Sequence, residues 1–168
     1  TGRTQEALSI YRRIHLESLS QGDVGASSSI QLALVLRASG EVAEARRVLA
    51  DAEQRVKAGR KYLDSGMDRQ IDLARVLAAN GEEQRALPML RQLQRAPHPD
   101  VTTLYMFAEI YSMLGRRDEA IRFLRRALDG KYFDAYYPLI GPEFAPLRRM
   151  PEFWALYPEC QPPMPARP

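Results

Sequence analysis

The sequence is poor in the residues on which several functional classes depend. It contains one cysteine, Cys160, which excludes an intrachain disulfide framework and a structural zinc site built from paired cysteines. It contains two histidines, His15 and His98, and no histidine cluster, glycine-rich phosphate loop or nucleophile elbow. Unbroken hydrophobic runs are short, such as residues 32–36, whereas a helix needs about 20 apolar residues to cross a bilayer. We therefore predict no catalytic residue, no metal site, no cofactor and no membrane span.

The sequence also lacks a large excess of charge of one sign. The chain carries 24 basic and 21 acidic residues, a net charge of +3, and the acidic residues are interspersed among arginine pairs. So small an excess favours a solvated, salt-bridged face over direct contact with nucleic acid, because phosphate affinity depends on accumulated positive charge. A single cysteine fits a cytoplasm as well as a periplasm, so the compartment stays open.

What the sequence does contain is an internal repeat. Alanine stands five residues after each of four glycines, and a large apolar residue stands nine residues after each. The pairs are Gly2 and Ala7, Gly40 and Ala45, Gly81 and Ala86, and Gly115 and Ala120. Apolar residues also recur eight, seven and four residues before the last three glycines. These helical spacings predict two amphipathic helices around each glycine, with the glycine providing the positive φ of the turn.

This pattern resembles that of the tetratricopeptide repeat family, whose unit is a helix–turn–helix of about 34 residues. The units read QLALVLRASGEVAEARRVLADA, DLARVLAANGEEQRALPMLRQL and TLYMFAEIYSMLGRRDEAIRFLRRAL, after an isolated second helix, GRTQEALSIYRRI. The family's tryptophan near the start of the first helix is absent. Pro88 falls inside a predicted second helix, where it removes one hydrogen bond. The resemblance implies an all-α fold, an α-α superhelix of helical hairpins. A chain that starts with a lone second helix is also expected to be a piece of a longer protein.

The spacing of the turn glycines refines this expectation. The last two are 34 residues apart, whereas Gly40 and Gly81 are 41 residues apart. Seven surplus residues are about two helical turns, so the helix from Glu41 is predicted to reach about Arg60 and to be the longest in the chain. Four surplus residues before Gly40 predict a loop at residues 21–28.

Beyond residue 130 the pattern changes. PEFAPL at residues 142–147 is echoed by PEFWAL at residues 151–156, and proline followed by glutamate is typical of a helix start. We predict two short helices that cover the open hydrophobic end of the repeats and bury Phe144, Phe153 and Trp154. Prolines dominate the C-terminal end, which predicts an extended or disordered tail. The predicted organisation is repeats over residues 1–130, capping helices over 131–160 and a proline-rich tail over 161–168.

The resemblance also implies where a partner would bind. First helices of the family line a concave groove that receives a peptide or a helix, and helical geometry places the groove residues between the packed positions. These predicted groove residues are Ile30, Arg37, Asp68, Ile71, Arg75, Tyr105, Met106 and Glu109. Tyrosine, methionine and arginine are enriched in interface cores. The alternative that some of these residues contact neighbouring helices stays open.

Three functions compete at this point. The leading hypothesis is a non-catalytic protein–protein interaction scaffold with a protein or peptide partner, and self-association is left open. The Pro-Glu-Phe ending is similar to one that follows helical repeats in bacterial regulators, including winged-helix transcriptional activators. That similarity implies an alternative, a sensory or regulatory segment whose DNA-binding domain lies outside this sequence, in a bacterial cytoplasm or periplasm. An enzyme built on a helical solenoid is the least favoured hypothesis.

Overall fold

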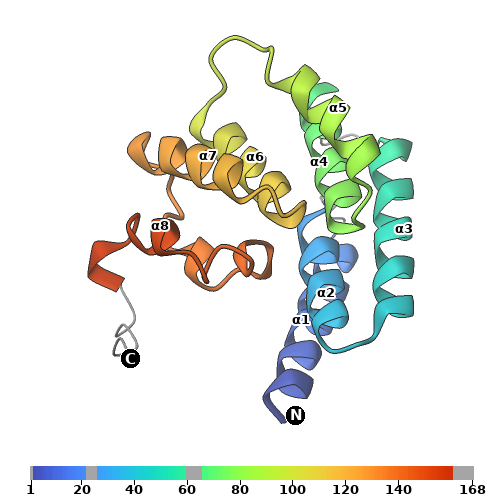
Figure 1. Ribbon diagram of the computed structural model, residues 1–168. Coiled ribbons are helices and arrows are strands. Elements are labelled where there is room, and N and C mark those ends of the chain that lie inside the picture. Colours follow the sequence, from blue (N-terminus) through green and yellow to red (C-terminus); the bar gives the residue numbers. More distant parts are fainter. Residues whose placement is uncertain (1, 22–25, 60–65, 161–168) are drawn as a thin grey trace. The chain divides into compact units, whose positions relative to one another are not determined.

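The structure is a computed structural model that describes residues 2–21, 26–59 and 66–160 (Figure 1). Within these ranges the chain is helical and contains no strand, which confirms the predicted all-α fold. Contacts divide the chain into two compact parts, an N-terminal unit up to Asp100 and a C-terminal unit from Val101. The predicted division at residue 130 follows the repeat pattern and stays a prediction.

The N-terminal unit contains a single helix followed by two helical hairpins. Its helices are α1 (Gly2–Ser20), α2 (Ser27–Ala38), α3 (Val42–Ala58), α4 (Gly66–Ala79) and α5 (Glu83–Leu93). Helices α2 and α3 pack side by side, as do α4 and α5, while α1 packs on α2 and α3 on α4 (Figure 1). This packing of helical hairpins is the one expected of the predicted all-α repeat fold.

Glycine in a left-handed conformation closes the first helix of every hairpin, as the register predicts. Gly40, Gly81 and Gly115 have φ values of 90°, 78° and 72°. The amide that follows each glycine donates to a carbonyl five residues earlier, for example Glu41 N–H to the oxygen of Leu36 at 2.8 Å. This is the hydrogen bond of a Schellman turn, and a side chain at these positions would strain it.

The prediction for α3 is right about the helical surplus residues and wrong about α3 being the longest helix. The helix continues to Ala58 and ends at Gly59, whose φ is 58°, so the surplus residues are helical as expected. It is nevertheless shorter, at 17 residues, than the 19-residue α1. Helix α1 is longer because no glycine or proline interrupts its sequence before Gly22. Half of the predicted loop, residues 22–25, and the expected helix end at Arg60 lie outside the described residues. The last two residues of the predicted loop, Ser27 and Ser28, already belong to α2.

The C-terminal unit is one hairpin followed by short turns. Its elements are α6 (Val101–Met113), α7 (Arg117–Asp129), the 3-10 helices η1 (Tyr137–Leu139) and η2 (Pro142–Phe144), α8 (Pro151–Trp154) and η3 (Pro158–Cys160). The hairpin is held by aromatic contacts, because the ring of Phe123 on α7 lies 5.6 Å from Phe107 and 5.5 Å from Tyr111 on α6.

The two Pro-Glu-Phe segments form the two short helices that the sequence predicts, η2 and α8. Phe144 and Phe153 are completely buried. Trp154 is only half-buried, and its indole N–H donates to the backbone oxygen of Arg148 at 2.8 Å. The burial prediction is therefore right for the two phenylalanines and only partly right for the tryptophan. The predicted tail at residues 161–168 lies outside the described residues.

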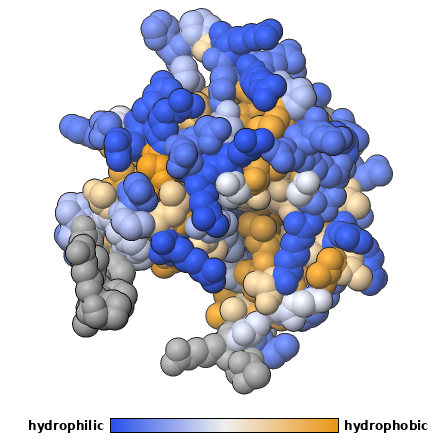
Figure 2. Space-filling model, in the orientation of Figure 1, coloured by the Kyte–Doolittle hydropathy of each residue, from blue (hydrophilic) through white to orange (hydrophobic). Residues whose placement is uncertain are grey.

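Polar side chains predominate on the face drawn in Figure 2. Figure 2 shows a hydrophilic face on which hydrophobic side chains emerge in small patches between charged ones. None of the described helices combines the length and the hydropathy that crossing a bilayer requires.

Candidate interaction surface

Five of the eight predicted groove residues are buried in the structure. Ile30, Ile71, Arg75, Tyr105 and Glu109 have exposed fractions between 0% and 5%. They occupy repeated positions on the first helices, ten or six residues before the turn glycine. The expectation that these positions are open to a partner is therefore wrong. The contacts of the groove positions in each unit show the physical reason.

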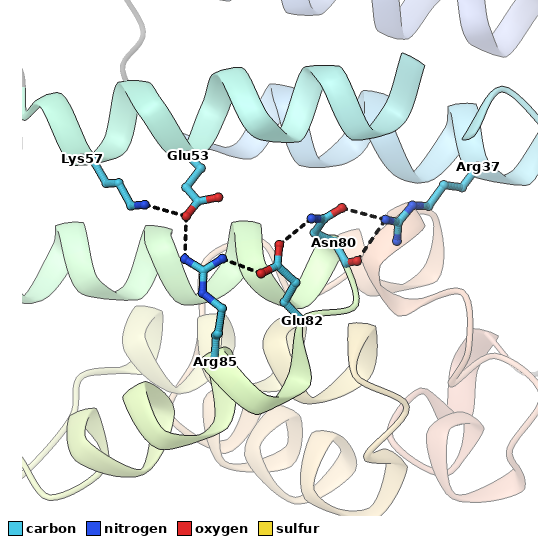
Figure 3. Close-up of polar contacts among 6 residues, drawn as sticks. All are labelled: Arg37, Glu53, Lys57, Asn80, Glu82 and Arg85. Atoms are coloured by element: carbon cyan, nitrogen blue, oxygen red, sulfur yellow. Dashed lines mark hydrogen bonds and ion pairs between the residues drawn. The ribbon is translucent and has the colours of Figure 1, made fainter. Parts of the chain in front are cut away.

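Arg37, three residues before its glycine, joins α2 to the next hairpin. Its guanidinium donates to the backbone oxygen of Ala79 and to both the backbone and side-chain oxygens of Asn80, the latter two at 3.2 and 3.0 Å (Figure 3). Burial lowers the pKa of the Arg37 guanidinium. The residue clamps α2 against the turn between α4 and α5, so it stabilises the contact between successive repeats.

The same polar network continues along the hairpins. The Asn80 amide donates to Glu82 at 2.5 Å, and Glu82 pairs with Arg85. Arg85 and Lys57 both lie 2.7 Å from Glu53 on α3 (Figure 3). Hydrogen bonds from Lys57 and Arg85 lower the pKa of Glu53, and those from Asn80 and Arg85 lower the pKa of Glu82. Because cations and carboxylates alternate, the network holds α3 and α5 together without creating a site of one charge.

Arg75 is a structural cation in the N-terminal unit. Its guanidinium lies 3.0 Å from the carboxylate of Asp72 and donates to the hydroxyl of Ser27 at 3.1 Å. The side chain is 6% exposed. Arg75 therefore links α4 to the start of α2 instead of presenting its charge to a partner.

Tyr105 likewise has a structural role, in the C-terminal unit. Its ring stacks on Tyr132 with centroids 4.1 Å apart and lies 5.4 Å from the ring of Phe144 in η2. Burial, followed by the nearby Glu109, raises the pKa of the Tyr105 hydroxyl. That hydroxyl has no hydrogen-bond partner among the described residues. The chain's own C-terminal turns cover this part of α6.

A hydrogen bond from α6 to the C-terminal turns also shows that these turns cover α6. Ser112, three residues before Gly115, donates to the backbone oxygen of Glu143 at 2.7 Å. Arg37 occupies the same repeat position and contacts the next turn. In both units these positions contact neighbouring elements of the chain. The spacing identifies one helix face but not what covers it, which is why the sequence assigned the face to a groove.

Three predicted groove residues remain accessible. Asp68 is exposed, and Arg37 and Met106 are partly exposed. Arg37 and Asp68 belong to the N-terminal unit and Met106 to the C-terminal unit. A partner-binding role for these three stays a prediction.

A different surface stands out when the second helices are compared position by position. Residues five, nine and twelve after the turn glycine are at most 5% exposed on α3, α5 and α7. They are Ala45, Leu49 and Ala52 on α3, Ala86, Leu90 and Leu93 on α5, and Ala120, Leu124 and Ala127 on α7. On α1 the same positions hold Ala7 and Tyr11, which are partly exposed, and Ile14, which is 38% exposed.

The adjacent position on α1 is open as well. Ile10, eight residues after Gly2, is 41% exposed. Its equivalent on α7 is Phe123, which is 5% exposed beneath Phe107 and Tyr111 of the preceding helix. We call Ala7, Ile10 and Ile14 the open face of α1.

The side chains on the opposite side of α1 are buried or form polar contacts with other helices. Leu8 is completely buried, and the His15 ring nitrogen Nδ1 lies 3.3 Å from the hydroxyl of Ser28 on α2. Arg12 pairs with Glu41 and Glu44 at 2.6 and 2.8 Å, next to the start of α3. The helix is therefore anchored on this side, whereas Ile10 and Ile14 are exposed.

The arginines of α7 do not form a site of one charge. A hollow of about 340 Å³ on the C-terminal unit is lined by Arg122, Arg125 and Arg126 together with Asp118, Asp129 and Glu152, besides Ile121. Three cations facing three carboxylates give little net potential for phosphate binding. Nor do the described residues contain a group of three or more histidines, cysteines and acidic residues placed to hold a metal ion.

Comparison with known protein families gives two matches. A family model described as Tetratrico peptide repeat matches residues 1–67, and one described as Tetratricopeptide repeat matches residues 77–138. The first match includes α1, α2 and α3, and the second includes the turn at Gly81 and the α6–α7 hairpin. A search of curated proteins and a search of solved structures gave no match.

Proposed function

Because this chain belongs to the tetratricopeptide repeat family, we propose that it is a non-catalytic scaffold that binds another protein through the open face of α1. Repeats of this family generally mediate protein–protein binding. The observation that carries the proposal is the exposure of two isoleucines one helical turn apart, Ile10 at 41% and Ile14 at 38%, while the residues equivalent to Ile14 on α3, α5 and α7 are buried.

The energetics of this face favour association. An isoleucine transferred from water to a packed interface contributes about 1.5–3 kcal/mol. Ile10 and Ile14 lie one helical turn apart, so one partner surface can cover both. The polar residues around them include Arg13 and Glu17, which are exposed and form a long ion pair of 3.9 Å. An apolar centre with a charged rim is the usual anatomy of a protein interface.

The accessible groove residues Arg37, Asp68 and Met106 are proposed as secondary contacts. Arg37 and Asp68 are charged, Met106 is apolar, and all three are at least partly exposed. Alanine at Asp68 or Met106 should weaken partner binding less than a charged residue at Ile10, because neither side chain completes a packed helix face.

Site-specific photocrosslinking tests the proposal. A photoreactive amino acid at Ile10 should form a crosslink to one defined protein in a native extract, and the same amino acid at Leu16 should not. Leu16 is the matched control because it is apolar and 66% exposed on the same helix, but its equivalents Gln54, Arg95 and Asp129 are exposed in every repeat. Equal crosslinking at both positions would show that the open face is not the binding surface. A crosslink between two copies of the chain would assign the face to self-association.

A second candidate function is a regulatory segment of a bacterial transcriptional activator. It is favoured by the two consecutive Pro-Glu-Phe turns, η2 and α8, that close the last hairpin. Deleting residues 131–160 from the native protein should then change the transcript levels of its target genes. Unchanged transcript levels in cells that lack this segment would remove the support for this function.

A further inference from the structure

We infer that the hollow on α7 is a second interaction surface, which binds a helical protein segment carrying two acidic residues between two basic ones. The hollow has a volume of about 340 Å³ and is lined by residues of α7 and by Glu152 of α8. All its lining residues belong to the C-terminal unit. The hollow and the open face of α1 share no residue, so either can fail its test without the other.

The charged side chains that line the hollow are not paired with one another. On α3 an acid and a base four residues apart, Glu53 and Lys57, form an ion pair of 2.7 Å. Asp118 and Arg122 have the same order and spacing on α7, where such a pair is favourable. Within the described residues, however, neither these two nor the other charged residues of the hollow form an ion pair. All of them are exposed, so both signs of charge are accessible to a partner.

An aromatic ring holds two of the arginines in place. The guanidinium carbons of Arg122 and Arg126 lie 5.2 and 5.5 Å from the ring centroid of Phe123, within the range of a cation–π contact. The ring itself is fixed, because Phe123 is 5% exposed and packs against Phe107 and Tyr111. Side chains that are already positioned lose less conformational freedom when a partner binds.

The charges follow a defined order along α7. Asp118, Arg122, Arg125 and Asp129 stand at spacings of four, three and four residues. At about 100° and 1.5 Å per residue, these side chains lie in one stripe about 60° wide and about 16 Å long. A partner helix with bases at the two outer positions and acids at the two inner ones meets an opposite charge at each. Exposed ion pairs are individually weak, so the order of the charges determines which partner binds.

The lining of the hollow favours a protein segment of another chain over a small ligand or a second copy. Small-ligand pockets are mostly apolar, whereas Ile121 is the only apolar residue that lines this hollow among the described residues. The spacing of four, three and four residues is the same in both directions along α7. A second α7 packed in register would therefore place acid against acid and arginine against arginine, whether it ran parallel or antiparallel. Like charges at an interface repel, so the complementary partner is a different sequence.

The probe is a fluorescently labelled helical peptide of alanine and glutamine, with lysine at its first and twelfth positions and glutamate at its fifth and eighth. Binding to the whole chain is measured by fluorescence anisotropy at an ionic strength of about 10 mM, where the Debye length is about 30 Å. The peptide should bind saturably. Arg122→Glu or Arg125→Glu should weaken binding by about tenfold or more, because each change replaces an attraction by a repulsion. Arg117→Glu should change it less than about twofold, because Arg117 is an exposed residue of α7 that does not line the hollow.

A peptide with the charges exchanged separates charge order from net charge. It carries glutamate at the ends and lysine in the centre, and has the same composition as the first peptide. It should bind the parent chain about tenfold more weakly or less, and should gain affinity when Arg122→Glu and Arg125→Glu are combined. Circular dichroism checks that each variant is folded.

Four results would overturn the inference. Equal binding of the two peptides, or an equal loss with Arg117→Glu and Arg125→Glu, would show that only net charge matters. No saturable binding of the first peptide at millimolar concentration would show that the hollow does not recognise this charge order. Saturable binding of inorganic phosphate that Arg125→Glu abolishes would assign the hollow to a small anion. Self-association in sedimentation experiments that Arg125→Glu abolishes would assign it to a second copy.

Discussion

Tyr105 lies where α6 meets the C-terminal turns, and two substitutions there distinguish packing from partner binding. Tyr105→Ala removes a side chain that is 4% exposed, together with its ring contacts to Tyr132 and Phe144. The expected loss is about 3–5 kcal/mol in the free energy of unfolding, the range for a buried aromatic residue truncated to alanine. Tyr105→Phe keeps both ring contacts and removes a buried hydroxyl that has no hydrogen-bond partner among the described residues. It should be neutral, or raise the free energy of unfolding by up to about 1 kcal/mol.

The only tryptophan, Trp154, allows the effect to be measured in the C-terminal unit itself. It lies on α8 and its N–H donates to the oxygen of Arg148 at 2.8 Å, so unfolding of this unit should change its fluorescence. Urea slopes of about 1–3 kcal/mol per molar mean that a loss of 3 kcal/mol lowers the midpoint by about 1 M or more. An unchanged midpoint for Tyr105→Ala would refute the packing role and return Tyr105 to the candidate binding residues. A loss for Tyr105→Phe as large as that for Tyr105→Ala would show that the hydroxyl is satisfied.

Three further substitutions test other features of the fold. Lys131 has a φ of 62°, so Lys131→Gly should raise the free energy of unfolding by about 0.5–1 kcal/mol in urea titrations, and a loss would argue against this backbone conformation. Pro88→Ala should restore a helical hydrogen bond within α5 and stabilise by about 1–3 kcal/mol in the same assay, and an unchanged or lower stability would contradict this cost of the proline. Hydrogen bonds from Lys57 and Arg85 lower the folded-state pKa of Glu53, so its contribution is complete above the unfolded pKa and is lost as pH falls through the folded value. Thermal melts across acidic pH should therefore show a shallower decline for Glu53→Gln than for the parent chain, and identical pH profiles would exclude this contribution.

Much of the fold could be predicted because it depends on local features of the sequence. The turn glycines specify where each first helix ends, since only glycine adopts φ values near 80° without strain. The Pro-Glu-Phe segments specify η2 and α8 for a similar reason, because proline at the first position suits the start of a helix. The seven surplus residues after Gly40 could be predicted to be helical because no glycine or proline interrupts α3 before Gly59.

The candidate site could not be predicted in the same way, because burial depends on residues far apart in the sequence. Tyr105 is covered by Phe144, and Arg37 is held by Asn80, 43 residues away. The sequence pattern around these residues indicates an amphipathic helix, but it does not show which element covers the apolar face. The same holds for α1, because the sequence places isoleucine at positions 10 and 14 but does not show that both side chains are exposed.

The accessibility of Ile14 tests the central claim most directly. In a Cys160→Ser background, single cysteines at Ile14, Leu16 and Ala52 can be labelled with a soluble thiol reagent in the native state. Ala52 occupies on α3 the position that Ile14 occupies on α1, and it is 1% exposed, compared with 38% for Ile14 and 66% for Leu16. If α1 presents an open helix-packing face, the cysteine at position 14 should react within about tenfold of the rate at position 16, while the one at position 52 reacts only through local opening, about 100-fold or more slowly. A cysteine at position 14 as protected as the one at position 52 would show that the face is closed and would contradict the proposed binding surface.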